Sequence, residues 1–160
     1  MTDIRIICVG KLKEKFYTAA ADEYVKRLGA YCKLSVLELP EERLNDRPSP
    51  AQIDAALDKE GERILSKIPA GAVVIALCVE GTLLSSEELA KKLEAWTVQG
   101  NSQFVFLIGG SFGMHRKVKE RAALRLSMSP MTFPHHLARV MVLEQVYRAF
   151  KINEGSGYHK

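Results

Sequence analysis

The chain has 160 residues, of which 47% are apolar and 26% charged, and these values predict one compact domain rather than a disordered polypeptide. The formal net charge of +4 fits an anionic partner such as nucleic acid, but it fits a mildly basic surface equally well. The longest apolar run, residues 72–79, is too short to cross a bilayer, and no secretory signal pattern opens the chain. We therefore expect neither export nor a membrane span.

Cysteine and histidine usage argues against disulfides and metal sites. The cysteines are odd in number and lie far apart in apolar stretches, where cysteine behaves as a small hydrophobic residue: Cys8, Cys32 and Cys78. The histidines match none of the spacings of zinc ligands: His115, His135, His136 and His159. We expect a reduced, cytoplasmic protein without a metal ion.

The first half of the chain alternates apolar segments with helical patterns. Residues 3–10 and 33–40 are rich in Val, Ile and Leu and are predicted as buried strands. The helix between them has one face with four-residue spacing: Phe16, Ala20, Tyr24 and Leu28. A second helix begins at Ser49, where Gln52 completes a capping box.

The second half repeats this alternation. Its segments are, in order, a strand at 72–79, a helix capped by Ser85 and Glu88, a strand at 102–110, a basic helix within 115–124, a weak strand at 124–129 and a helix from about His135 to Ile152. Strands that alternate with helices pair in parallel, so we predict a single α/β domain over residues 1–160, with a mostly parallel sheet and helices on both faces. Ligands of such folds bind at the carboxyl ends of the strands.

Three loops at predicted strand ends are candidates for a binding site. Gly109, Gly110 and Gly113 in "LIGGSFG" would let a ligand approach the backbone, although turns need glycine too. This loop lacks the Gly-Lys-Ser/Thr ending of a phosphate loop, which disfavours nucleoside triphosphates. The loop "SPMTFP", residues 129–134, is stiffened by two prolines and either reads a ligand with its backbone or turns a corner.

The third loop, "LCVEG" at residues 77–81, contains a cysteine. Cys78 is a conceivable nucleophile, but no histidine base is adjacent in sequence and no arginine follows at the spacing of a phosphatase loop. A buried thiol is therefore the better interpretation.

"LIGGSFG", the segment from "LSMSPMTFPHHLARV" to the final "GYHK", and the opening "ICVGKLKEKFYTAAADEYVKRL" together resemble the RlmH family. This family comprises SPOUT-class methyltransferases that methylate N3 of a pseudouridine in 23S rRNA. The resemblance implies S-adenosylmethionine as methyl donor, a homodimer, a deep trefoil knot near the C-terminus and the assembled ribosome as substrate. It also implies cofactor contacts at Leu77, Gly109, Gly110, Ser129, Pro130, Met131, Thr132, Phe133 and Pro134. Family members usually have aspartate where this chain has Cys78, and a thiol orients a cofactor group less strongly than a carboxylate does.

Methylation at N3 requires that the proton on this nitrogen be removed or the anionic base be stabilised. The groups that we consider for this step are His159, Arg139, Arg148 and Lys160, with His159 as the natural proton acceptor. Tyr158 would stack on the target base or a neighbouring nucleotide. The two glycines before it, Gly155 and Gly157, would let this tail fold as a lid over the cofactor, whereas the alternative is a frayed chain end.

Two further surfaces are predicted. The basic segment "HRKVKERAALR" offers Arg116, Lys117, Lys119, Arg121 and Arg125 to RNA phosphates, or is merely a solvated helix face. Lys160 in the tail is a further candidate for RNA binding. The last helix is apolar nearly all round, which predicts burial on more than one side and suggests a dimer interface. Glu144 and Arg148 are spaced to form an ion pair on it.

Two other functions remain open on the sequence. One is a ribosome-associated binding module that keeps the fold without the reaction, with Cys78 as a sign of drift. The other is a flavodoxin-like ligand-binding domain without a role on RNA, which would be a monomer. The apolar last helix argues against the second alternative.

Overall fold

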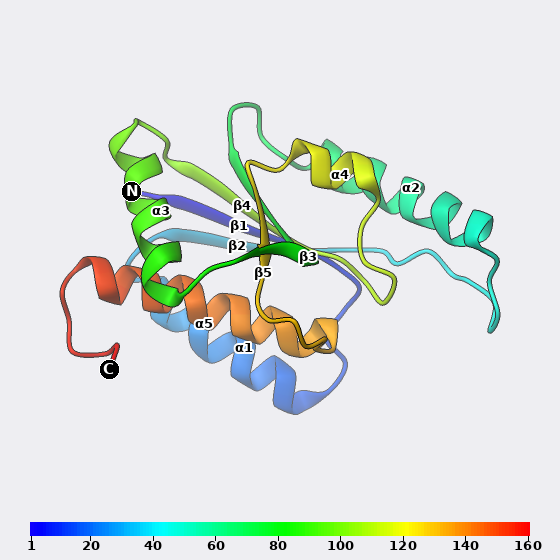
Figure 1. The fold of residues 1–160 in the computed structure, drawn as a ribbon. Helices are drawn as coiled ribbons and strands as arrows, with labels where there is room; N and C mark the ends of the chain where they lie inside the picture. Colours follow the sequence, from blue (N-terminus) through cyan, green and yellow to red (C-terminus); the bar gives the residue numbers. More distant parts are fainter.

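The computed structural model describes residues 1–160 and contains one sheet with the strand order β2-β1-β4-β3-β5, in which all neighbours are parallel (Figure 1). The strands are β1 (Asp3–Val9), β2 (Lys33–Leu39), β3 (Val73–Leu83), β4 (Gln103–Ile108) and β5 (Leu124–Ser127). The helices are α1 (Lys15–Leu28), α2 (Pro50–Ser66), α3 (Ser86–Val98), α4 (Arg116–Arg121) and α5 (His135–Asn153). The predicted α/β class and every predicted element are confirmed. The trefoil knot stays a prediction of the resemblance.

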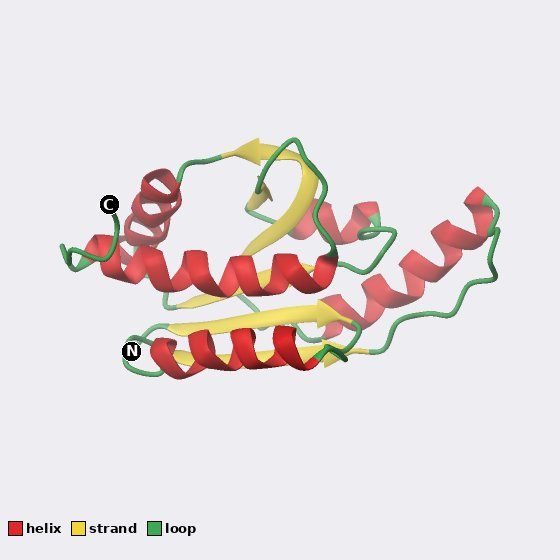
Figure 2. Ribbon diagram, turned by 90° about the horizontal axis from the view of Figure 1, so that it is seen from below, coloured by secondary structure: helices red, strands yellow, loops and turns green.

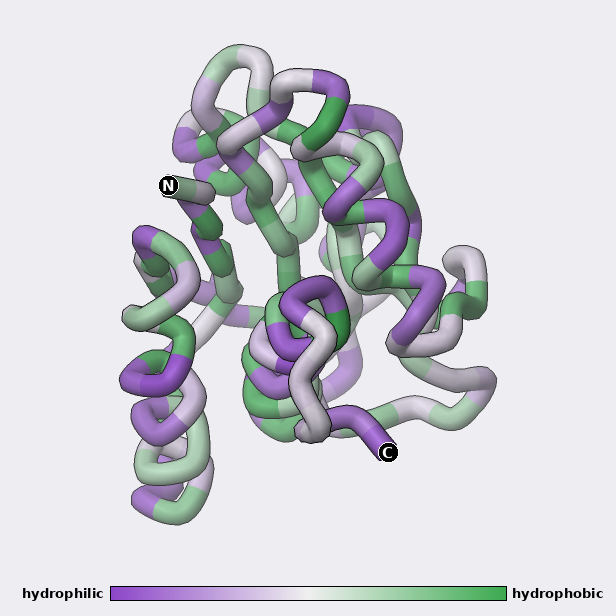
Figure 3. Tube along the Cα trace, turned by 90° about the vertical axis from the view of Figure 1, so that its left-hand side faces the viewer, coloured by the Kyte–Doolittle hydropathy of each residue, from purple (hydrophilic) through white to green (hydrophobic).

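The helices cover both faces of the sheet, as expected. Helices α1, α3 and α5 lie on one face, and α2 and α4 lie on the other (Figures 1 and 2). Successive strand residues point to opposite faces, so in β1 Ile4 and Ile6 join the first core while Ile7 and Val9 join the second. Figure 3 shows the resulting pattern, with hydrophobic residues along the strands and hydrophilic residues distributed around the helices.

Helix starts are predicted better than helix faces. Ser49 and Ser85 form the expected capping boxes at the starts of α2 and α3. In α1, however, Phe16 is 66% exposed, whereas Ala21 and Leu28 are buried. The predicted face is therefore not buried at the start of the helix, where Phe16 lies in the first turn against the Tyr17 ring.

The burial of α5 is explained within one chain. Helix α5 packs between α1 and α3 and above the sheet, and none of its residues from His135 to Ile152 is classed as exposed. Its polar side chains find local partners: Gln145 accepts a hydrogen bond from the Ser86 hydroxyl at 2.6 Å. The apolar character of this helix therefore does not by itself require a second chain. None of the helices is long and apolar enough to span a bilayer.

Candidate active site

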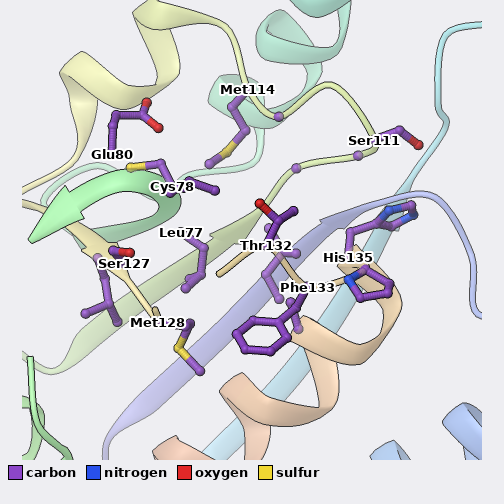
Figure 4. A pocket seen from close by; sticks show the side chains of 18 of the residues that line it. Leu77, Cys78, Glu80, Ser111, Met114, Ser127, Met128, Thr132, Phe133 and His135 are labelled. Carbon is purple, nitrogen blue, oxygen red and sulfur yellow. The ribbon is translucent and has the colours of Figure 1, made fainter. Parts of the chain in front are cut away.

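A cavity of about 760 Å³ opens at the carboxyl ends of β4 and β5, beside the middle of β3 (Figure 4). Its walls come from residues 77–80 within β3, the glycine loop after β4, the proline loop after β5 and the first turn of α5. The volume lies within the range of small-molecule and cofactor sites. It is located where parallel α/β sheets bind ligands.

The glycine loop, residues 109–113, is a tight turn that requires glycine at two of its positions, Gly109 and Gly113. A Cβ atom on Gly109 would lie 2.5 Å from the carbonyl oxygen of Gly113, a separation that real Cβ atoms do not tolerate. Gly113 has a φ of +83°, in the left-handed region that favours glycine, and its N–H donates to Gly110 O at 3.0 Å. The glycines therefore form the turn and also leave its backbone accessible from the cavity.

The segment predicted as the end of β3 is instead an irregularity within this strand. The pairing of β3 with β5 shifts register between Leu77 and Thr82, and the strand continues to Leu83. Gly81 is required because a Cβ atom on it would lie 2.6 Å from Arg125 O on the neighbouring strand. The irregularity places residues 77–80 in the cavity wall, as β-bulges near active sites commonly do.

Cys78 lines the cavity but has the properties of a protonated thiol. Burial raises the pKa of Cys78, and the nearby carboxylate of Glu80 raises it further. Its Sγ lies 3.7 Å from Ala76 O. Glu80 itself forms an ion pair with Lys119. The thiol is therefore half-buried rather than buried as predicted, but its raised pKa argues against a nucleophile as the prediction did.

The proline loop is held by its own serines. The Ser127 hydroxyl donates to Ser129 O at 3.1 Å, and Ser129 Oγ accepts from Met131 N–H at 3.0 Å. The structure thus brings nearly all predicted cofactor residues together in one cavity: Leu77, Gly109, Gly110, Ser129, Met131, Thr132, Phe133 and Pro134. Pro130 is not among the lining residues.

His135 lines the same cavity and was missed as a site residue by sequence reasoning. Its ring points from the start of α5 toward Ser111 in the glycine loop (Figure 4). Burial lowers the pKa of His135; the neighbouring His136 and Arg139 lower it further, and Glu41 opposes them. The signal available in the sequence was its position directly after the proline loop.

Arg139 does not line the cavity but joins three elements beneath it. Its side chain is 4% exposed and donates to Glu38 Oε2 at 2.5 Å and to Gly10 O at 2.9 Å. Its Nε has no partner. Burial alone would raise the pKa of Glu38, but hydrogen bonds from Arg139 and from Leu12 N–H outweigh it, so this pKa is lowered. These contacts fasten α5 to the ends of β1 and β2.

The C-terminal tail lies at the other end of α5 (Figure 1). Arg148 forms the predicted ion pair with Glu144, with Nη2 and Oε1 2.5 Å apart, and its guanidinium lies over the Tyr158 ring at 4.8 Å. His159 contacts Arg148 Nη1 at 3.0 Å and Glu87 Oε1 of α3 at 2.5 Å. The structure therefore gathers Tyr158, His159 and Arg148 into one tail cluster, but this cluster does not cover the cavity of its own chain.

The predicted RNA-binding residues differ in whether their charge is already neutralised by an ion pair. Lys117 bonds to Asp58 and Glu62, each at 2.5 Å, and Lys119 is paired with Glu80. Arg116 is 85% exposed and only weakly paired, and Lys160 is exposed. Helix α4 therefore presents less positive charge than its sequence indicates, because α2 and β3 neutralise two of its lysines.

Comparison with known proteins assigns the family. A family model described as "Predicted SPOUT methyltransferase" matches residues 2–159. One similar solved structure is that of a probable methylase family protein from Haemophilus influenzae Rd KW20, with a TM-score of 0.55 and 15% identity over 98% of this chain and 70% of that chain. At this identity the structural likeness shows the fold alone. Because the family model spans nearly the whole chain, the protein belongs to the SPOUT methyltransferase family.

Proposed function

We propose that this protein is an S-adenosylmethionine-dependent methyltransferase of the RlmH type, which methylates N3 of a pseudouridine in 23S rRNA of the assembled ribosome. We further propose that it acts in the cytoplasm as a homodimer. The observation that carries the proposal is the single cavity of about 760 Å³ in which the bulge of β3, the glycine loop and the proline loop meet. The family supports methyl transfer, and the resemblance of the glycine loop, the proline loop and the tail supports the substrate.

The residues of the cavity fit the cofactor. Half of the 22 lining residues are hydrophobic, which suits an adenine ring, and the loops supply backbone groups for its polar edge. No arginine lines the cavity, and its one lysine, Lys119, is already paired with Glu80, so the site is not built for phosphate. Leu77, Gly109 and residues 129–134 would hold the cofactor, which supplies an activated methyl group when bound.

Proton removal from N3 needs an acceptor close to the cavity. In one chain the imidazole nearest to it is that of His135, which lines the wall. Because its pKa lies below the ordinary value, His135 is neutral near pH 7 and able to accept a proton. His159, the candidate from the sequence, must be supplied by a rearranged tail or by a second copy of the chain.

Helix geometry favours the second copy. Ala138 lines the cavity and Arg148, ten positions later on the same helix, holds the tail, which places them about 15 Å apart along the axis. A lid in the same chain would have to give up the bonds of His159 to Arg148 and Glu87. In the proposed homodimer, the tail of one chain would instead complete the cavity of the other.

Mixed dimers distinguish the two arrangements. One chain lacks residues 158–160, and the other carries Gly109→Ala, which disables the glycine loop. If a tail serves the partner's cavity, the mixed dimer regains methyl transfer that neither variant shows alone. If each tail closes its own cavity, the mixture stays inactive.

The function itself is tested in two steps. Calorimetry should detect binding of S-adenosylmethionine to the purified protein, and mass mapping of rRNA nucleotides should then locate one new methyl group on unmodified ribosomes. Binding to ribosomes without methyl transfer would favour the non-catalytic module instead. Failure to bind the cofactor would refute the proposal.

A further inference from the structure

A second recess, of about 430 Å³, adjoins the glycine loop. It is bounded by the segment after β2, by α2 and by Ser111 and Phe112, which also line the first cavity. The segment after β2 and the start of α2 project from the body of the molecule (Figure 2), so that the recess forms between this projection and the glycine loop. No predicted site residue lies in it.

The recess contains a buried carboxyl group that is only half satisfied. Glu60 is 6% exposed, and its Oε2 accepts a hydrogen bond from Glu42 N–H at 2.8 Å. Its other oxygen, Oε1, has no hydrogen-bond partner within the chain and is not fully buried. Burial raises the pKa of Glu60, and the carboxylates of Glu41 and Glu42 add to this effect. The hydrogen bond from Glu42 N–H and the charge of Arg63 only partly offset it. A cationic donor in the recess would relieve this arrangement.

The surrounding charge favours a cation over an anion. Three carboxylates line the recess, those of Glu41, Glu42 and Glu60, against one cationic side chain, that of Arg43. Glu42 is already paired with Arg63 at 2.6 Å, whereas Glu41 forms no ion pair. Two acceptors, on Glu41 and Glu60, are thus available to a ligand.

Phe112 adds an aromatic surface. It is 51% exposed although it is large and apolar, and it forms part of the wall. Aromatic rings bind guanidinium groups on their faces, and carboxylates bind the planar N–H fork of a guanidinium in preference to a compact ammonium.

We propose that this recess binds the guanidinium group of an arginine side chain presented by a basic protein. Carboxylate oxygens of Glu60 and Glu41 would accept its N–H groups, and the Phe112 ring would cover its face. A nucleotide is a poorer occupant, because these carboxylates would repel its phosphate. The inference goes beyond methyl transfer and does not depend on the reaction: it assigns a protein contact to a recess that adjoins the cofactor cavity and shares Ser111 and Phe112 with it.

The test is a titration of the full chain with Nα-acetyl-arginine amide, followed through backbone amide signals by nuclear magnetic resonance. We expect shifts confined to the recess, near Glu42, Glu60 and Phe112. The citrulline analogue has the same shape without the charge and should bind about tenfold more weakly. The affinity for the arginine probe should rise with pH as Glu60 loses its proton, because the ionised carboxylate is the binding form.

Matched variants localise the effect. Glu60→Gln keeps an acceptor for Glu42 N–H but removes the charge, and it should weaken binding about tenfold. Glu62→Gln, on the same helix but paired with Lys117 outside the recess, should bind as the unmodified protein does. Equal binding of arginine and citrulline, no loss in Glu60→Gln, or stronger shifts with guanosine monophosphate would each overturn the proposal. Methyl transfer on ribosomes is measured separately, so failure of the reaction and failure of this inference are distinguishable.

Discussion

Removing Arg139 from its ion pair with Glu38 should cost several kcal/mol of stability. Arg139→Met keeps the volume of the side chain but removes its bonds to Glu38 Oε2 and Gly10 O. Hydrogen bonds to charged groups contribute about 1.5–3 kcal/mol each, and breaking a buried pair costs about 3–5 kcal/mol. Because the Glu38 side chain is 34% exposed and can be partly hydrated, we take the lower end, about 3 kcal/mol. For a chain of this size, this corresponds to a fall in Tm of about 6–12 °C.

The pH dependence of stability gives a second, independent test of the ion pair. The pKa of Glu38 is lower in the folded than in the unfolded protein, so its contribution is present above the unfolded pKa of about 4.3 and is lost as the pH falls through the folded value. The difference in stability between the unmodified protein and Arg139→Met should therefore shrink below about pH 4. Urea unfolding at a series of pH values measures this difference.

A matched control separates the pair from a general loss of charge. Arg116→Met removes an arginine that is 85% exposed and should change the unfolding free energy by less than about 0.5 kcal/mol. If Arg139→Met unfolds within about 1 kcal/mol of the unmodified protein, or if the difference persists at low pH, the structural role that we assign to Arg139 is wrong. Intact stability together with lost methyl transfer would point instead to the catalytic role considered from the sequence.

Three other predictions concern the cavity and the tail. Gly109→Ala should abolish cofactor binding in calorimetry, because its Cβ atom would lie 2.5 Å from Gly113 O, whereas Gly157→Ala, with no atom within 4 Å, should bind normally. Cys78 should react slowly with iodoacetamide at pH 7 and faster as the pH rises, because its pKa is raised. Bound S-adenosylmethionine should protect it, and mass spectrometry measures the extent of alkylation with and without the cofactor. Deletion of residues 158–160 should abolish methyl transfer on ribosomes while costing about 1 kcal/mol of stability, from the lost ring contacts of the tail; unchanged activity would mean that the tail only packs.

The sequence predicts the glycine and proline loops of the cavity well, because the effect of these residues on the backbone is local. Glycine and proline act on the backbone where they stand, so "LIGGSFG" and "SPMTFP" indicate loops at strand ends without knowledge of the fold. Gly81 shows the limit of this reasoning. Glycine is required at this position because the backbone of Arg125 on the neighbouring strand leaves no room for a Cβ atom, and no local pattern reveals this contact. For this reason the sequence predicts a strand end where the structure has a bulge in β3.

Charges are predicted less well, because their effect depends on partners distant in sequence. Lys117 belongs to a basic segment, yet it is neutralised by carboxylates of α2 that precede it by 55 and 59 positions. Glu38 and Arg139 are 101 positions apart, and nothing in either local pattern indicates that they pair. The same holds for Glu60, an ordinary acidic residue on a helix until the segment after β2 folds over it.

Helix α5 joins these observations, because one rigid element carries residues of both sites. Its first turn contributes His135 to the cavity, and its later turns hold the tail through Arg148. A helix cannot shorten, so the distance between the two sites is fixed by the number of residues between them. Movement of the tail over its own cavity would have to break the contacts of His159 with α3 and α5, whereas a second chain could bring its tail to the cavity with this helix unchanged. The length of α5 is therefore itself an argument that the proposed reaction needs two chains.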